Sequence, residues 1–109
     1  MGYYTRYALE LDTFDPDLIR EVEAALGALT NVEFSYAGSG RFEAGEETKW
    51  YGHEADVRAL SVRFPAVRFL LAGEGEENGD LWRKYFRAGR MQECRASIVY
   101  PPFDEGHLR

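Results

Sequence analysis

The sequence lacks the features that mark exported and membrane proteins. Its single cysteine, Cys94, excludes a disulfide within the 109-residue chain. No apolar run approaches the roughly 20 residues that a membrane-spanning helix needs. The first residues also lack the basic-then-apolar pattern of a secretory signal. We therefore expect a protein of a reducing cytoplasm with no membrane contact.

Cations are scarce, because 13 Lys and Arg stand against 19 Asp and Glu, for a net charge of −6. The deficit lies mainly in residues 1–50, whereas residues 81–100 carry five cations and one carboxylate. An acidic body argues against general nucleic-acid binding, since phosphates attract clustered cations. It fits a basic protein surface as partner, including one that normally holds nucleic acid.

The first two thirds of the chain alternates strand and helix patterns. Residues 3–11 alternate between apolar and polar, as in a half-buried strand. Asp15 and Pro16 mark a helix start, as N-cap and first helical residue, and Gly27 marks its end. The pattern further predicts a short strand at 32–36, a loop over 38–48 and a second helix at 54–64 that Pro65 ends.

Residues 67–100 predict a three-stranded meander, whose first strand starts with Val67, Phe69 and Leu71 and whose other strands lie at 81–88 and 92–100. Asn78-Gly79 favours a type I′ turn, which would set Leu71 opposite Phe86 and Glu74 opposite Arg83. A three-residue loop at 89–91 would set Phe86 opposite Cys94 on the buried face.

Lys84 is out of place in this pattern, because it shares a face with Trp82 and Phe86. Either its stem reaches along the sheet to water or the register differs by one residue.

The element order β-α-β-α-β-β-β, with helices for one face only, predicts an α+β two-layer sandwich. The theme is ferredoxin-like, with a mostly antiparallel sheet, one domain at 1–103 and a tail at 104–109. An open edge on the third or fifth strand would allow a homodimer. The uncovered face is expected to carry Leu70, Ala72, Glu74, Arg83, Tyr85, Arg87, Glu93, Arg95 and Ser97.

The preferred functional hypothesis is a non-enzymatic protein that occludes a basic partner. Carboxylates of the first helix and the following loops would attract the partner electrostatically, and aromatic residues would contribute affinity at the contact. Trp50 and Tyr51 would serve as anchors or would close the end of the core. The predicted partner-binding residues are Asp17, Glu21, Glu23, Glu43, Glu46, Glu47, Trp50, Tyr51 and Tyr85.

The alternative is a single-stranded nucleic-acid-binding module. Its residues would be Arg83, Tyr85, Arg87 and Arg95, which the predicted register places together on the open face. The glycine-aromatic motifs typical of RNA-binding sheets are absent, and the acidic body weakens this interpretation.

The sequence contains little evidence for a catalytic or metal-binding site. His53, Glu54 and Asp56 stand at a helix start, where capping explains them better than acid–base catalysis. Cys94 and the two histidines are too scattered for zinc, and the acidic tip 74–80 lacks a calcium-loop spacing. We expect no catalytic residue, no metal and no cofactor, although a small enzyme of unrecognised type stays a third hypothesis.

Four tracts of the chain carry a family resemblance. They are the opening Gly2–Tyr7 and the later tracts Lys49–Val57, Gly73–Phe86 and Gly89–Gln92. They resemble a family of small proteins encoded by bacteriophages and other mobile elements. The chain also resembles, more loosely, the YubB-type ferredoxin-like domain. The family resemblance implies an origin in phage or plasmid DNA and a role in the bacterial cytoplasm. It brings no catalytic residues. By analogy with small acidic proteins of that origin, we expect an inhibitor of host defence such as an anti-CRISPR protein.

Overall fold

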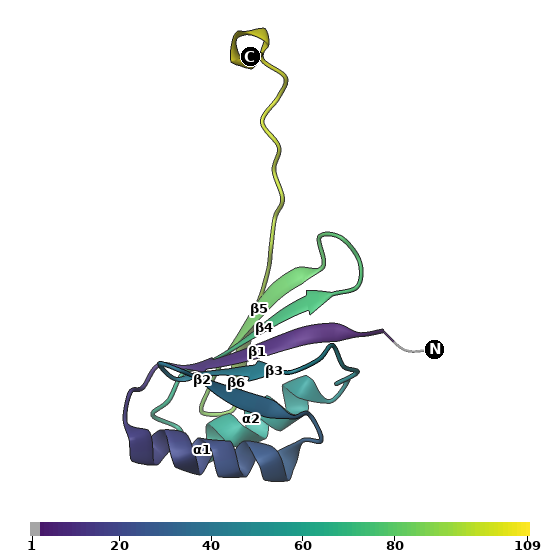
Figure 1. Cartoon of the computed structure of the whole chain (residues 1–109). Coiled ribbons are helices and arrows are strands. Elements are labelled where there is room, and N and C mark those ends of the chain that lie inside the picture. The colour runs from purple at the N-terminus through teal and green to yellow at the C-terminus, as the bar shows by residue number, and fades with distance from the viewer. Residues whose placement is uncertain (1–2) are drawn as a thin grey trace.

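The computed structural model describes residues 3–109, so Gly2 of the opening tract lies outside the described residues. Six antiparallel strands form one sheet, and two helices cover one of its faces (Figure 1). The elements are β1 Thr5–Leu11, α1 Pro16–Leu29, β2 Phe34–Gly38, β3 Arg41–Ala44, α2 His53–Arg63, β4 Phe69–Gly75, β5 Leu81–Arg87, β6 Arg90–Arg95 and the 3-10 turn η1 Glu105–His107.

The first six elements form a ferredoxin-like unit. Their order is β-α-β-β-α-β, and the strand order β2-β3-β1-β4 continues through β5 and β6 on one side. The predicted α+β two-layer fold with helices on one face is therefore confirmed. The whole sheet is antiparallel.

The predicted loop over residues 38–48 is wrong, because it contains β3. Arg41–Ala44 pairs with both β2 and β1, and Phe42 and Ala44 are buried. The strand is only four residues long and stands between glycine-rich turns, so its period of two is hard to see. Gly40, at φ +76°, allows the close approach, since a Cβ there would lie 2.8 Å from the Leu11 carbonyl oxygen.

Both helix starts agree with the sequence to within a residue. The Asp15 carboxylate accepts a hydrogen bond from the Asp17 backbone N–H at 3.0 Å and caps α1. The expected stop at Gly27 is wrong, because α1 continues to Leu29. One glycine inside a helix costs only about 1 kcal/mol of stability relative to alanine. Burial of Leu26, the residue before Gly27, offsets this cost.

The β4–β5 hairpin has a longer loop than predicted. Only Gly79 has a positive φ, and Leu71 lies opposite Lys84 instead of Phe86. Because the register differs by two residues, every side chain keeps its predicted face. Tyr3 fixes this loop: its hydroxyl donates to the Asp80 carboxylate at 2.6 Å and accepts the Glu77 N–H at 3.1 Å.

The β5–β6 hairpin has a shorter turn than predicted. Ala88 and Gly89 both have positive φ, as a type I′ turn requires, and Phe86 lies opposite Met91. The shift is odd, so β6 is turned over: Glu93 and Arg95 lie on the helix-covered side of the sheet and Cys94 lies half-buried on the open face. The prediction that Glu93 and Arg95 lie on the open face is therefore wrong, and so is the prediction that Cys94 lies in the core.

Helix α2 holds that turn in place. Arg58 donates to the Gly89 carbonyl oxygen at 3.0 Å, and the Gly89 N–H donates to the Ser61 hydroxyl at 2.8 Å. The contact joins segments about thirty residues apart, so local sequence patterning cannot reveal it.

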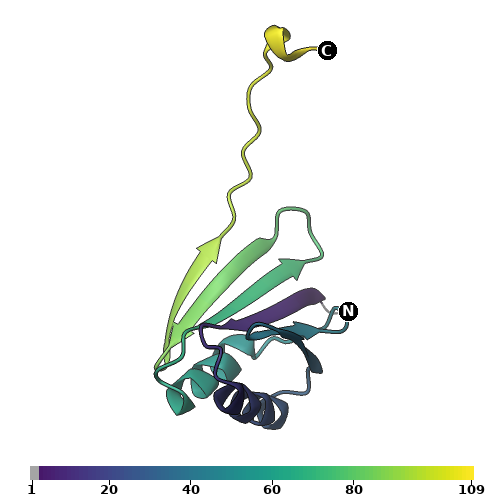
Figure 2. The same ribbon diagram turned by 60° about the vertical axis from the view of Figure 1, so that its left-hand side comes forward.

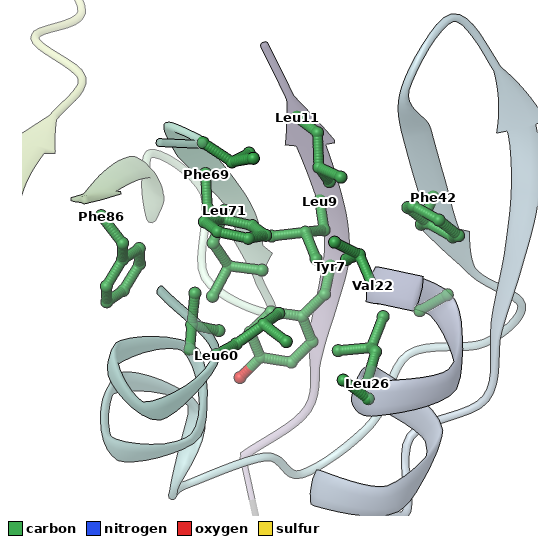
Figure 3. Packing of buried hydrophobic residues seen from close by; sticks show 14 of the residues in the cluster. Tyr7, Leu9, Leu11, Val22, Leu26, Phe42, Leu60, Phe69, Leu71 and Phe86 are labelled. Atoms are coloured by element: carbon green, nitrogen blue, oxygen red, sulfur yellow. The ribbon is translucent and has the colours of Figure 1, made fainter. Parts of the chain in front are cut away.

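The core lies between the helices and the central strands. Val22 and Leu26 of α1 and Leu60 of α2 point toward the sheet (Figure 3). They pack on the inward side chains of four strands, which include Tyr7, Leu9, Phe42, Phe69, Leu71 and Phe86. Within residues 3–109, neither helix has the length and apolar character to cross a bilayer.

Strand β6 ends at Arg95, five residues before the predicted Tyr100. Residues 96–109 are exposed and run away from the sheet, with η1 near the end of the chain (Figure 2).

Candidate functional site

Two acidic segments distant in sequence flank the same strand at one end of the sheet. Thr5, at the start of β1, bonds to Thr48 of the β3–α2 loop and lies opposite Gly75 of β4. The loop before Thr48 and the hairpin tip after β4 therefore flank the same strand end. We call the exposed carboxylates of these segments, together with Glu74 near the end of β4, the acidic end; they are Glu46, Glu47, Glu74, Glu76 and Glu77.

The cations near the acidic end include Arg6, Arg95 and Lys49, whose ammonium lies 5.0 Å from the centroid of the Tyr4 ring. Arg6 lies 3.6 Å from Glu47, and Arg95 lies 2.9 Å from Asp80. The Tyr3 hydroxyl and then Arg95 hold the pKa of the Asp80 carboxyl below its usual range. The same bond to Asp80 raises the pKa of Tyr3. The five outer carboxylates thus leave a negative field that these cations offset only in part.

An exposed aromatic residue stands beside the acidic end. The Tyr51 side chain is 70% exposed, and its hydroxyl accepts a hydrogen bond from the Tyr3 backbone N–H at 2.8 Å. This bond ties Tyr51 to the start of β1, within the same end of the molecule. An aromatic residue so fixed loses little entropy on binding.

Trp50, predicted as a second anchor, is buried and cannot serve as one. Its ring meets Tyr7 edge-on at 5.2 Å, and its indole N–H donates to Asp56 at 2.7 Å. It closes the end of the core, as the other interpretation of this residue expected.

The remaining predicted acidic residues lie on other faces. Asp17, Glu21 and Glu23 are exposed on α1, in the helix layer. Glu43 lies on the open side of β3, where it accepts a hydrogen bond from Arg41. One flat partner surface cannot cover all of them, so only Glu46 and Glu47 join the hairpin tip.

The open face of the sheet carries a basic aromatic hollow of about 480 Å³. Arg68 lies over the Tyr85 ring at 5.4 Å, and Arg87 and Arg90 complete the rim. Arg83, Tyr85 and Arg87 share this face as predicted. Arg95 does not, because the register of β6 places it with Trp82 on the other face.

Sequence reasoning missed a buried polar cluster around Lys84. Its ammonium donates to His53 Nε2 and to Glu54 Oε2, each at 2.7 Å, and lies 4.4 Å from the centroid of Trp82. Glu93 adds a more distant carboxylate at 3.8 Å. Lys84 is 5% exposed, so the side chain lies in the core beneath α2 and does not reach along the sheet to water.

His53 has a fixed orientation within this cluster. Its Nδ1–H donates to the Trp50 carbonyl oxygen at 2.8 Å, which leaves Nε2 free to accept from Lys84. Burial, and then the Lys84 charge, lower the pKa of His53. The hydrogen bond from Lys84 lowers the pKa of Glu54.

The hydrogen bonds of this cluster link α2 to β5, as a structural network does. Lys84 lines none of the four hollows described within residues 3–109, while the side chains of its partners Glu54 and Glu93 are 44% and 38% exposed. The sequence signal for this cluster was a lysine on an apolar strand face, Lys84, and a His-Glu pair at residues 53 and 54. Only the fold brings the two together. Among residues 3–109, no group of three or more His, Cys, Asp or Glu side chains could hold a metal ion.

Comparison with known proteins adds no relative. No family model, no curated protein and no solved structure matches the chain. The resemblance to a phage-encoded family therefore stays a prediction.

Proposed function

We propose that this chain is a non-enzymatic protein that binds and occludes a basic surface of a partner protein through its acidic end. The observation that carries the proposal is that the loop with Glu46 and Glu47 and the hairpin tip flank the same end of β1. Tyr51, fixed beside them, supplies an aromatic anchor. Such a field steers a basic partner, and the aromatic residue contributes affinity.

The biological setting follows from the sequence resemblance. A chain of phage or mobile-element origin would meet its partner in the cytoplasm of a bacterial host. A host defence protein with a nucleic-acid-binding groove presents the basic surface that the acidic end fits. The proposed activity is therefore inhibition of such a system, of the anti-CRISPR kind.

The test is capture of partners by tagged protein from nuclease-treated bacterial lysate, followed by mass spectrometry. The double variant Glu46→Lys/Glu76→Lys should lose the captured partner. The matched control Glu21→Lys/Glu23→Lys makes the same charge change on α1 and should keep it. Equal loss in both pairs would indicate a net-charge effect and contradict a localised site.

The second candidate, a single-stranded nucleic-acid-binding module, rests on the basic aromatic hollow. Arg68, Arg87 and Arg90 surround the half-buried Tyr85 ring, and an aromatic ring among cations is typical of sites that bind single strands. Arg87 also pairs with Asp12 at 3.0 Å. Fluorescence anisotropy with labelled DNA and RNA oligonucleotides tests this candidate. Arg87→Ala/Arg90→Ala, at the rim of this hollow, should then abolish binding and flatten its salt dependence. Wild-type protein with no salt-dependent signal would remove this candidate.

A further inference from the structure

The two edges of the sheet differ in how well they are protected. Edge strand β2 carries an irregularity between Tyr36 and Gly38, a device that discourages pairing with another chain. Edge strand β6 pairs with β5 in unbroken register, and the first proline after it is Pro101. Its outer backbone groups face solvent as an open template for another strand.

The chain continues β6 with an extended segment rich in exposed apolar side chains. Figures 1 and 2 both show this segment projecting beyond the sheet. Val99, Tyr100 and Phe103 are about four-fifths exposed, and Ile98 is half exposed. Several large apolar residues in a row without cover mark an interaction surface.

We propose that this edge pairs with β6 of a second copy of the chain, antiparallel about a two-fold axis at Cys94. The six-stranded sheets of the two copies would then form one continuous sheet. A self-complementary edge of this kind is the usual interface of a two-fold dimer.

The hydrogen-bond pattern of β6 decides which residues can pair across the axis. The Ala96 N–H donates to the Leu81 carbonyl oxygen, so even-numbered residues of this strand bond inward to β5. The residues whose backbone groups face the free edge are Met91, Glu93, Arg95 and Ser97. A two-fold pairing must join members of this set to one another.

Charge favours one register among the pairings that remain. An axis at Glu93 or at Arg95 places like charges directly opposite one another, which is unfavourable. An axis at Gln92 shortens the paired stretch and leaves Arg95 outside it. An axis at Cys94 places Glu93 opposite Arg95 of the second copy, twice by symmetry, and extends the pairing to Ile98.

The same register gives the projecting segment a place to bind. Beyond Ile98 it passes the Ala88-Gly89 turn of the second copy and reaches the basic aromatic hollow beside it. Tyr100 would cover the apolar part of that hollow, and the carboxylates of Asp104 and Glu105 would meet its arginine rim. Both the apolar contact and the charge complementarity therefore favour the projecting segment of the second copy as the occupant of this hollow.

The first experiment combines sedimentation equilibrium of the full chain with oxidation of Cys94. We expect a dimer that oxidation converts to a disulfide-linked pair, because opposed residues at this axis lie within disulfide reach. The control Cys94→Ser/Gln92→Cys moves the cysteine away from the two-fold axis but keeps it on the open face of the sheet. Disulfide formation between the two copies should then be much slower. A chain that stays monomeric, or a control that links as readily, would overturn the proposal.

The second experiment exchanges the charges across the interface. Glu93→Arg and Arg95→Glu should each weaken the dimer about tenfold, because each creates two like-charge contacts. The double variant Glu93→Arg/Arg95→Glu restores opposite charges and should recover dimerisation. Circular dichroism confirms the fold of each variant, since Glu93 and Arg95 also contact Lys84 and Asp80. Failure of the double exchange to rescue a folded protein would reject this register.

Discussion

At the scale of single residues, the chain places a lysine in its core and surrounds it with partners. Burial of the Lys84 ammonium is costly unless charge and hydrogen bonds compensate it. Glu54 and His53 supply that compensation from α2, and the Trp82 ring adds a cation–π contact. The cluster thereby links α2 to β5 through hydrogen bonds in addition to apolar contact.

The lowered pKa of His53 makes the fold sensitive to acid. Because the folded state disfavours the charged imidazole, the unfolded chain takes up this proton first as the pH falls below about 6.5. The free energy of unfolding should therefore decrease from pH 7.5 to pH 5. The loss from Glu54, whose pKa is lowered from about 4.5, should follow at lower pH.

Urea denaturation at several pH values measures this effect. His53→Gln keeps a hydrogen-bond acceptor for Lys84 and should flatten the profile between pH 7 and 5. His107→Gln, in the exposed segment, should leave it unchanged. A profile that His53→Gln does not alter would assign the acid sensitivity to other groups.

Removal of the Glu54 charge tests the compensation directly. Glu54→Gln should lower the free energy of unfolding by about 1–2 kcal/mol, since Lys84 loses its closest carboxylate while Glu54 itself is partly solvated. Glu46→Gln, at an exposed loop position, should change it by less than about 0.5 kcal/mol. Equal effects in chemical denaturation would mean that the buried pair contributes nothing specific.

At the scale of elements, the β5–β6 turn determines which side of β6 faces the helices. A two-residue turn at Ala88-Gly89 sends Glu93 toward Lys84 and Cys94 to the open face. Helix α2 holds this turn through Arg58 and Ser61. The position of one turn thus decides both the charge around Lys84 and the composition of the open face.

Ala88 adopts φ +50°, which a residue with a Cβ rarely does. Ala88→Gly should therefore stabilise the protein by about 0.5 kcal/mol, because relief of strain exceeds the added chain entropy. Ala72→Gly, within β4, should instead destabilise it by up to about 1 kcal/mol. Thermal and urea unfolding compare the two, and a destabilised Ala88→Gly would show that the turn is unstrained.

At the scale of the whole molecule, charge is separated along the sheet. The acidic end surrounds the start of β1, and the basic aromatic hollow lies around the opposite ends of β5 and β6. The proposed dimer uses the free edge of β6, and the proposed function uses the exposed carboxylates of the acidic end. The two surfaces adjoin at Arg95, which bonds to Asp80. Variants at Glu46 and Glu76 therefore test the proposed function, and variants at Glu93 and Cys94 test the dimer.

Steering by the acidic end predicts a kinetic signature. Against the captured partner, Glu46→Lys/Glu76→Lys should slow association more than it speeds dissociation, and added salt should reduce the difference. Biolayer interferometry at several ionic strengths measures both rates. A change in the dissociation rate alone would exclude steering and leave only a contact role for these residues.

The sequence by itself determined the α+β class, the two helix starts, the alternating faces of β1, β4 and β5, and the excess of carboxylates. These features depend on local periodicity, capping residues and composition, which a short window contains. The tertiary structure decided the rest. It paired β3 with two strands, set both hairpin registers through Tyr3 and α2, buried Trp50 and Lys84, and brought Glu46 and Glu47 beside the hairpin tip. Each of these outcomes depends on a contact between residues far apart in the chain, and local patterning carries no information about such contacts.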